Sequence, residues 1–472
     1  MSAASSSELS IPLLIANYLN ASGYSSTLAS FLKENPIPNF DSLPAPPIDL
    51  RDLVEEYNHA RLNEIFQKMK VEKDEEEEAV LNRTVKDQEL PSKVEKTFGS
   101  IHAGNILSVS VHDVPRRSFN TTTARYETIL HPSLLTTSSD KTLKITSLST
   151  GEVKDILEPH KAAILSVAVH PQCGRLIGTG SMDGSAKIID LITQKTLQTF
   201  QNQKFVVRVL FSPTGNYFAT ASYDHTLKVY RLRTPLPLAP NLGPSNDEDE
   251  EEDISELESD YELVKILEVK SNPEGLVFGP PTEETGEAAW LAFTTRGDHH
   301  IKYLMLPSSV EDQAEWEIRK FNLNPNGDDF VSFSILSLAL HPSNKFIAMT
   351  TGDHTGPQSS RVFLYPFLSK ERKATLWTGS ECDQFTVTRM SWAPSGNFVA
   401  VTSTDGYVRL LDLQGRVRRA IRAHGEHPTT GVKNDVVRDV FIFSKGTTES
   451  EGNGEGWKVL SCGFDWTVRL LA

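Results

Sequence analysis

The sequence predicts an all-β domain of seven repeated units, preceded by a small α-helical unit near the N-terminus. Three observations lead to this prediction: a turn motif that recurs, the spacing of its copies, and alternating apolar residues before each copy. In every regular copy an aspartate is followed four positions later by a basic residue. The regular copies are SSDKTLKI with Asp140, SMDGSAKI with Asp183, SYDHTLKV with Asp224, RGDHHIKY with Asp298, STDGYVRL with Asp405 and GFDWTVRL with Asp465. A seventh copy, at residues 353–361, has the same frame stretched by a few turn residues.

The spacing of the copies indicates the size of one unit. The first two intervals, from Asp140 to Asp183 and from Asp183 to Asp224, are 43 and 41 residues. Four-stranded propeller blades repeat at roughly this period. The later intervals are longer, and we expect insertions at residues 113–132, 234–260 and 447–456.

Alternation of apolar and polar residues predicts the strands of each unit. Two such runs precede each aspartate, as in LSVAVHPQCGRLIGTGS and VRVLFSPTGNYFATASYD. A period of two marks strands with one buried face, and the Pro- and Gly-containing pieces between the runs predict hairpin turns. Short apolar runs such as LKI and AKIID follow the aspartates and predict a third strand.

The residue types at these turns resemble the WD repeat. In that family the turn aspartate accepts hydrogen bonds from backbone amides and from a histidine in the loop that opens the blade. The resemblance implies the pairs His102 with Asp140 and His160 with Asp183, and it leaves His424 and His427 as alternatives in the last unit. The closing Trp-Asp dipeptide is eroded, for example to Ile189-Asp190. A structural, turn-capping role is expected for His102, Asp140, His160, Asp183, Asp224, Asp298, Asp405 and Asp465.

The ends of the repeat region predict how the ring closes. The sequence ends at Ala472 just after a third strand, TVRLLA, so the last unit lacks its outer strand. Residues 94–100 form a short alternating stretch that is left over before the first unit. A sheet shared between the first and last segments would remove the open edge. We therefore expect a seven-bladed WD-type propeller over residues 93–472.

Charge is concentrated in one segment. The chain has 62 acidic and 47 basic residues, a net charge of −15, and ten of the acids lie within residues 247–260. Dense like charge with low apolar content predicts a disordered insertion at about 234–260. Ser245, Ser255 and Ser259 each precede an acid by three residues, the context that acidophilic kinases prefer, so they are candidate phosphorylation sites. An acidic chain argues against direct nucleic-acid binding.

No motif predicts catalysis, a cofactor or a metal. The chain has no glycine-rich phosphate loop, His-Glu-x-x-His helix or nucleophile elbow. Cys173, Cys382 and Cys462 are odd in number and far apart, so neither a disulfide framework nor a zinc site follows from them. We expect a protein that is not an enzyme. Without a signal segment or a membrane-spanning stretch, it is expected to be intracellular and soluble, in cytoplasm or nucleus.

The N-terminal residues 7–34 form a second recognisable unit. Apolar residues at helical spacing are interrupted by a glycine, which predicts two short helices. The pattern resembles the LisH motif at Leu13, Leu14, Ile15, Tyr18, Leu19, Gly23, Tyr24, Thr27, Phe31 and Glu34. The resemblance implies dimerisation, since two short helices cannot bury their apolar face alone. Packing of the hairpin on its own propeller is the alternative.

Two further segments connect these units. Residues 35–48 contain many prolines and predict a stiff linker. Residues 49–80 predict an amphipathic helix that gives way, at residues 72–78, to a solvated acidic spacer.

The two resemblances together indicate a LisH-containing WD-repeat protein. Such an architecture implies a non-catalytic scaffold that forms a homodimer and binds partner proteins on the propeller rim. A scaffold or substrate-receptor subunit of a ubiquitin ligase is one alternative, although the Trp-Asp-x-Arg motif of receptors is absent at residues 230–233. A component of a nuclear chromatin or RNA-processing complex is another.

The rim is expected to carry large aromatic side chains and arginines, the residue types that dominate binding energy. Its positive charge favours acidic or phosphorylated peptides as ligands. The rim residues expected to bind partners are Met182, Arg208, Tyr223, His225, Arg389, Arg438, Phe464 and Trp466.

Overall fold

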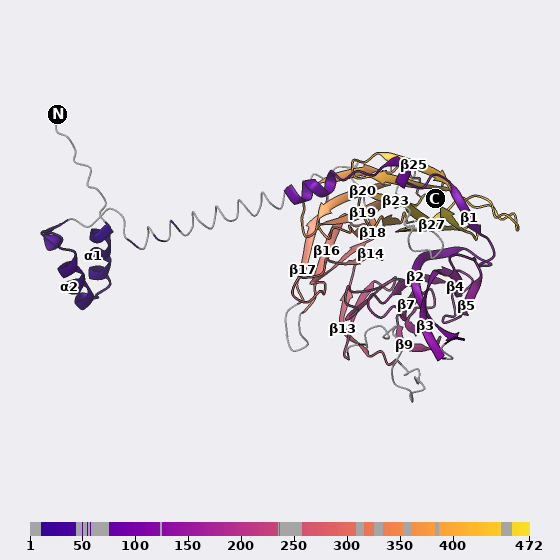
Figure 1. Cartoon of the computed structure of the whole chain (residues 1–472), viewed down its shortest axis with the longest axis horizontal. Helices are drawn as coiled ribbons and strands as arrows, with labels where there is room; N and C mark the ends of the chain where they lie inside the picture. The colour runs from indigo at the N-terminus through magenta and orange to yellow at the C-terminus, as the bar shows by residue number, and fades with distance from the viewer. Residues whose placement is uncertain are drawn as a thin grey trace. The chain divides into compact units, whose positions relative to one another are not determined.

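The computed structural model describes residues 11–43, 50, 54, 57, 75–122, 125–234, 236, 257–307, 316–324, 334–352, 360–382, 387–444 and 456–472. The chain divides into two compact units, Met1–Ala79 and Val80–Ala472, and each is described by itself (Figure 1). Among the described residues, no helix is both long enough and apolar enough to cross a membrane.

The N-terminal unit contains a pair of short helices, α1 (Ile11–Ala21) and α2 (Ser25–Glu34). Gly23 separates them with a φ of 77°, a left-handed conformation that glycine adopts without strain. The predicted helix pair broken at Gly23 is thus confirmed. A 3₁₀ turn, η1 (Phe40–Ser42), follows within the proline-rich segment. Most of the predicted helix at residues 49–70 lies outside the described residues.

The larger unit is built from seven antiparallel sheets of four strands each, which confirms the predicted number of blades (Figure 1). Blade one contains β2 (Ile106–Asn120), β3 (Arg125–Ser138), β4 (Leu143–Ser147) and β5 (Val153–Leu157). Blade two contains β6 (Ile164–Val169), β7 (Leu176–Ser181), β8 (Ser185–Asp190) and β9 (Thr196–Gln201). Blade three contains β10 (Val206–Phe211), β11 (Tyr217–Ser222), β12 (Thr226–Leu232) and β13 (Tyr261–Glu268).

The remaining blades follow in chain order. Blade four contains β14 (Pro273–Phe278), β15 (Trp290–Thr295), β16 (His300–Met305) and β17 (Ile318–Asn322). Blade five contains β18 (Ser334–Leu340), β19 (Phe346–Gly352), β20 (Arg361–Pro366) and β21 (Ala374–Trp377). Blade six contains β22 (Met390–Trp392), β23 (Phe398–Val401), β24 (Tyr407–Asp412) and β25 (Val417–Arg422). Blade seven contains β26 (Val437–Ser444), β27 (Trp457–Gly463), β28 (Val468–Leu471) and, as its outer strand, β1 (Val94–Phe98).

Strand β1 closes the ring. It pairs antiparallel with β28, from Val94 opposite Leu471 to Phe98 opposite Val468. Lys93 and Ala472 exchange backbone hydrogen bonds of 3.2 and 3.0 Å at the end of this ladder. The predicted closure by the segment before the first blade is confirmed, and it gives blade seven the same four strands as the others.

The segment that leads into β1 lies along blade six. It contains a 3₁₀ turn, η2 (Asp87–Glu89). The Arg83 guanidinium donates to the carbonyl of Ser395 over 3.0 Å, and the Gln414 amide donates to the carbonyl of Leu81 over 3.0 Å. The chain therefore binds blade six before it completes blade seven.

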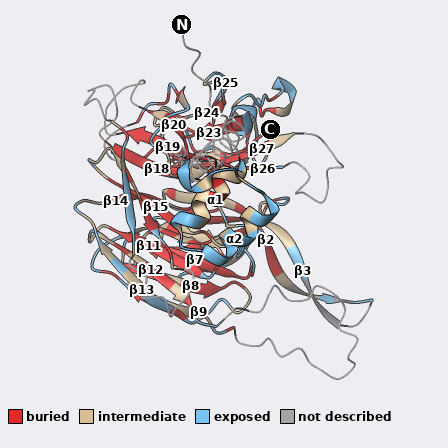
Figure 2. Cartoon of the chain, turned by 90° about the vertical axis from the view of Figure 1, so that its left-hand side faces the viewer, coloured by how far each residue is buried: buried red, intermediate tan, exposed pale blue. Residues whose placement is uncertain are grey.

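The core lies between neighbouring blades. Residues from adjacent sheets form shared apolar clusters, and the strands in the middle of each sheet are largely buried (Figure 2). Gly178 on β7 shows how tightly the sheets approach, because a Cβ there would lie 2.5 Å from the ring of Phe218 on β11. The absence of a side chain at Gly178 thus makes room for that ring.

Blade one differs from the prediction. Residues 113–132 were expected as an insertion between strands, but β2 and β3 continue through them as one ladder, from Asp113 opposite Pro132 to Asn120 opposite Arg125. The long hairpin extends away from the body of the sheets (Figure 2). The polar residues and prolines of this stretch hide its strand character, because only the inner end of its described part, at Val114, reaches an apolar cluster.

The C-terminal boundary expected for the acidic insertion is also wrong. The acidic insertion was expected to reach residue 260, but Leu257 is buried in an apolar cluster with Phe211 and Tyr261. Residues 235 and 237–256 of the insertion lie outside the described residues. The acidic spacer at residues 72–78 was expected to be solvated. Of its described residues, Glu75, Glu76 and Glu78 are exposed and Glu77 is buried, within a helical segment over residues 75–81.

Candidate functional site

The aspartate turns gather one network of polar side chains per blade. In blade one the Nδ1–H of His102 donates to Asp140 over 2.9 Å, and the other ring nitrogen contacts the hydroxyl of Thr136 at 2.8 Å. The hydroxyl of Thr142 donates to the same aspartate over 2.7 Å. The network ties the loop that opens the blade to the turn before its third strand.

Blades two and seven have the same arrangement. His160 lies 3.0 Å from Asp183, and His424 lies 2.9 Å from Asp465. The alternative in blade seven is thereby settled, since His427 instead contacts the carbonyl of Gly99 at 2.7 Å. Burial by itself would raise the pKa of Asp465, but the hydrogen bonds from His424 and Thr467 outweigh it and lower that pKa to about 2.

The other described turns hold their aspartates without such a histidine. Asp224 accepts the backbone N–H of Gln203 over 2.9 Å and that of Thr226 over 3.1 Å. Lys302 donates to Asp298 over 2.7 Å, and Arg409 donates to Asp405 over 2.5 Å. In these last two blades the basic residue four positions on takes the place of the histidine. The stretched copy at residues 353–361 lies mostly outside the described residues.

The residue after each aspartate adopts a left-handed backbone conformation in several blades. Glycine fills this position at Gly184 and Gly406, but His225 and Trp466 have φ values of 67° and 63°. Such a conformation costs a residue with a side chain of order 1 kcal/mol or more. His225 is exposed, whereas the indole N–H of Trp466 donates to Asn105 of blade one over 3.1 Å. Trp466 therefore contacts the neighbouring blade as well as lying at the turn.

Exposed apolar side chains lie at the aspartate turn of blade two and in the loop that opens blade three. Met182 and Phe205 are 39% and 40% exposed. The ring of Phe205 is centred 6.4 Å from that of Tyr223, whose hydroxyl donates to Glu274 over 2.9 Å. Phe464, also expected at the rim, is only partly exposed.

Three residues of this region were missed by the sequence analysis: Phe205, Glu274 and Arg296. Arg296 donates to the same carboxylate oxygen of Glu274 over 2.8 Å. The sequence could have singled out Arg296, because it stands two residues before Asp298, where four other turns have a serine before their aspartate. Each of those serines accepts the backbone N–H of its aspartate, which arginine cannot do.

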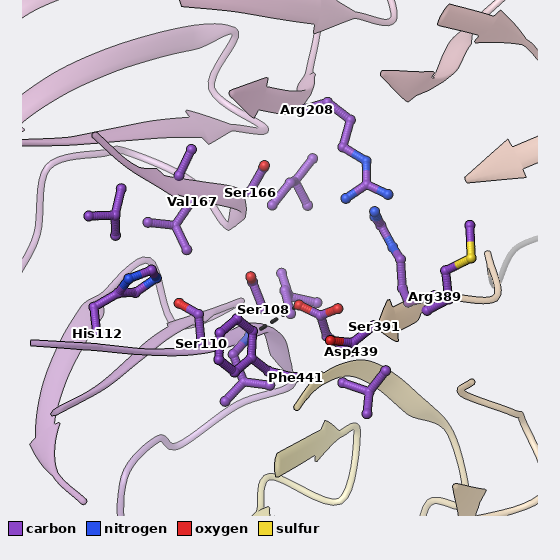
Figure 3. A pocket seen from close by; sticks show the side chains of 17 residues that line it. Ser108, Ser110, His112, Ser166, Val167, Arg208, Arg389, Ser391, Asp439 and Phe441 are labelled. Carbon is purple, nitrogen blue, oxygen red and sulfur yellow. Dashed lines mark hydrogen bonds between the residues drawn. The ribbon is translucent and has the colours of Figure 1, made fainter. Parts of the chain in front are cut away.

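Two of the three arginines expected to ring the central opening line one cavity. Arg208 and Arg389 line a cavity of about 290 Å³ formed by the innermost strands of several blades (Figure 3). Burial lowers the pKa of Arg208 to about 10, so it stays protonated at neutral pH. Arg438 is not part of the cavity wall, but it interacts electrostatically with Arg208 and Asp439.

One group of residues has the composition of a metal site. Asp298, His299 and His300 bring ligand atoms within 4.8 Å of one another. However, the ammonium of Lys302 lies 2.7 Å from Asp298, and the carboxylate also accepts a 2.7 Å hydrogen bond from His300. A cation already pairs with the only carboxylate of the group, so these residues do not fit a metal ion.

Of the predicted phosphorylation sites, only Ser259 lies within the described residues. Its hydroxyl donates to the side-chain oxygen of Gln198 over 3.2 Å. Ser245 and Ser255 lie outside them. The three cysteines are buried, and no disulfide joins Cys173, Cys382 and Cys462.

Sequence comparison agrees with the repeat geometry. The family model described as "WD domain, G-beta repeat" matches residues 151–190 and 194–231, which cover most of blades two and three. A second model, the WD40 domain of anaphase-promoting complex subunit 4, matches residues 368–432 in blades five and six.

Curated relatives match parts of the chain. The guanine nucleotide-binding protein beta-1 subunit of Nicotiana tabacum is 30% identical over 25% of this chain and 33% of that protein. Pre-mRNA-processing factor 19 of Dictyostelium discoideum is 25% identical over 32% of this chain and 27% of that protein. A Mus musculus subunit of chromatin assembly factor 1 is 23% identical over 51% of this chain and 42% of that protein.

The chain spans well under half of the length of each of these relatives. The family-model matches in blades two and three include turns in which the aspartate accepts the backbone N–H of the residue two positions later. The family matches and the seven four-stranded blades together show that the chain carries WD40 repeats in a seven-bladed WD propeller.

Proposed function

We propose that this chain is a non-catalytic scaffold that binds partner proteins on the face of the propeller where the aspartate turns lie. One observation carries the proposal: apolar side chains are exposed at turns that the polar networks hold in place. Met182 is exposed at the aspartate turn of blade two, and Phe205 is exposed in the loop that opens blade three, where its ring lies beside that of Tyr223. Exposed apolar and aromatic side chains on a rigid frame are typical of binding surfaces.

The strained turn at His225 supports the same face. Glycine would relieve the left-handed backbone there, yet the chain has an exposed imidazole. The strained backbone at His225 lowers the stability of the fold, and an exposed side chain regains little of it through packing. We therefore assign this side chain a role in binding. Because Arg208 and Arg389 lie in the central cavity, we propose that the partner segment is acidic or phosphorylated.

Affinity purification with mass spectrometry tests this face. Replacing Met182 and Phe205 together by aspartate should remove partners that the wild-type chain captures. A matched control replaces Ile156 and Ile266, exposed apolar residues on outer strands β5 and β13, by aspartate and should leave the partners unchanged. Equal partner lists for both folded variants would contradict the proposed face.

We further propose that the chain forms a homodimer through residues 7–34, as the LisH resemblance implies. Helix α2 has no buried residue, and Ile11 and Tyr24 are exposed large apolar side chains. A second copy would cover this apolar surface, which a hairpin of two short helices leaves in water.

Light scattering after gel filtration measures this association. The wild-type chain should have about twice the 52.4 kDa mass of one copy. Replacing Tyr24 and Phe31 by aspartate should give monomers, because charges would enter the apolar contact. Ser30→Asp, on an exposed position of the same helix, is the control. A monomeric wild-type chain at micromolar concentration would remove the homodimer from the proposal.

Membership in a larger assembly is a second part of the proposal. The match to the WD40 domain of anaphase-promoting complex subunit 4 favours a ubiquitin ligase scaffold. The similarity to pre-mRNA-processing factor 19 and to chromatin assembly factor 1 favours a chromatin or RNA-processing complex. The proteins captured with the wild-type chain distinguish these assemblies directly.

A further inference from the structure

Two arginines from separate blades converge in the central cavity. Arg208 comes from β10 of blade three, and Arg389 directly precedes β22 of blade six. Their guanidinium groups point toward one another across the cavity (Figure 3). Since like charges in a partly dehydrated space repel each other, this arrangement needs a counter-charge.

The two guanidinium groups have few partners of their own. Arg389 is only 8% exposed, and its Nη1 has no hydrogen-bond partner within the described part of the chain. The Nε of Arg208 reaches the carbonyl oxygen of Glu274 at a long 3.5 Å. A buried charged donor without a partner costs stability, so Arg389 is not explained by the stability of the ring alone.

Nearby carboxylates do not balance the positive charge. Asp439 lies in the cavity wall and accepts the backbone N–H of Val109 over 3.2 Å. Glu274 is already engaged by Tyr223 and Arg296. Within the cavity wall itself, the two guanidinium groups of Arg208 and Arg389 therefore outnumber the single carboxylate of Asp439.

Hydroxyl groups add donors to the cavity wall. Ser166 accepts the backbone N–H of Val209 over 3.2 Å, and Ser391 accepts that of Ile442 over 3.1 Å. A serine hydroxyl can donate its proton while its oxygen accepts, so both hydroxyls can also donate to a bound ligand. Both serines line the same cavity as the arginines. Beside its apolar residues and Asp439, the wall thus offers two guanidinium groups and hydroxyl donors, which suit an oxyanion.

We propose that the cavity between Arg208 and Arg389 binds one phosphate group. A phosphate monoester carries about −1.5 to −2 charges at neutral pH and three acceptor oxygens, so it can accept from both guanidinium groups and from the serine hydroxyls, whereas a carboxylate has only two oxygens. A cavity of about 290 Å³ admits such a group but no folded segment. The inference deepens the proposed function and rests on it, because the phosphate would belong to a phosphorylated side chain of the partner; free phosphate is the other source.

Calorimetry and thermal unfolding of the full chain test the site. The probes are inorganic phosphate and N-acetyl-O-phosphoserine amide, each in chloride buffer at matched ionic strength. Both should bind saturably and raise the unfolding temperature as the free ligand rises above its Kd. Arg208→Met and Arg389→Met should each weaken binding at least tenfold. Arg422→Met is the control, since its side chain on β25 is 65% exposed.

A second measurement separates binding from a structural role. In phosphate-free buffer Arg389→Met should unfold at the wild-type temperature or above it, because the variant lacks an unpartnered buried charge. A large decrease in that temperature would assign Arg389 to ring stability and would overturn the proposal. The proposal would also be overturned if neither probe bound saturably, or if both cavity variants bound the probes as tightly as the wild-type chain.

The two probes distinguish the sources of phosphate. Binding of the phosphoserine amide supports a phosphorylated side chain, whereas binding of inorganic phosphate alone supports a free ion in the same site. The capture experiment with Met182 and Phe205 does not depend on these probes. Failure of the phosphate site and failure of the proposed binding face are therefore separate results.

Discussion

Replacing Asp465 by alanine should destabilise the propeller more than the same change at another turn. The Asp465 side chain is fully buried and accepts hydrogen bonds from groups that lie in two different loops. His424 donates over 2.9 Å, and the backbone N–H and hydroxyl of Thr467 donate over 3.1 and 2.8 Å. Arg469 lies 3.6 Å from the second carboxylate oxygen. Alanine would leave these buried donors without their acceptor.

The size of the effect follows from the contacts. Removing one partner of a buried charged network costs about 3–5 kcal/mol. Unfolding of a domain of about 390 residues changes the entropy by about 0.8 kcal/mol/K, so 1 kcal/mol shifts the Tm by about 1.2 °C. Asp465→Ala should therefore lower the Tm by about 4–6 °C.

Asp224→Ala is the matched control in a turn without a histidine. Asp224 is partly exposed and accepts donors from Thr226 and Gln203. Water can replace some of these contacts, so we expect a loss of about 1–2 kcal/mol. Calorimetric Tm values of both variants at neutral pH provide the comparison. An equal or larger decrease for Asp224→Ala would refute the argument that the buried histidine network makes the difference.

Three further predictions concern acid stability, ring closure and the acidic insertion. The pKa values of Asp183 and Asp465 are lowered to about 2, so each carboxylate contributes about 2 kcal/mol to the free energy of unfolding. This contribution is present above pH ~4 and is lost as the pH falls toward 2. Urea unfolding across this range should show the decline, and equal stability at pH 5 and pH 2 would contradict it. Deleting residues 94–98 should expose the edge of β28 and produce aggregates in gel filtration, whereas a monodisperse product with unchanged Tm would show that β1 is dispensable. Deleting residues 237–256 should leave the Tm unchanged, while Leu257→Ala should cost about 2–5 kcal/mol; equal Tm changes would place the boundary of the folded region elsewhere.

The fold could be predicted from the sequence because each blade repeats local information. The strand alternation and the aspartate turns recur with one frame, and the partner strand for β28 could be identified as the leftover segment at residues 94–100. The hairpin of β2 and β3 was missed for the opposite reason. Its outer half pairs without burying a regular apolar face, so residues 113–132 lack the alternation that marks a strand.

The site was predicted only in part, because it depends on how the blades are arranged in three dimensions. The positions of Arg208 and Arg389 near the starts of first strands placed them close to the central opening. Their convergence depends on which blades face each other across the ring, which no local pattern contains. The contact of Tyr223 with Glu274 likewise joins blades three and four, so it could not be inferred from either repeat alone.

The pairing of β1 with β28 has a consequence for the order in which the protein is made. On the ribosome β1 emerges before every other strand of the ring, but its partner emerges after all the others. The contact between Thr97 and Arg469 joins residues that are 372 positions apart. Domains acquire structure from the N-terminal side during synthesis, so blades one to six precede the partner that β1 requires. The nascent ring therefore has an open seam until translation reaches β28, and during that interval both unpaired edges are exposed to other chains.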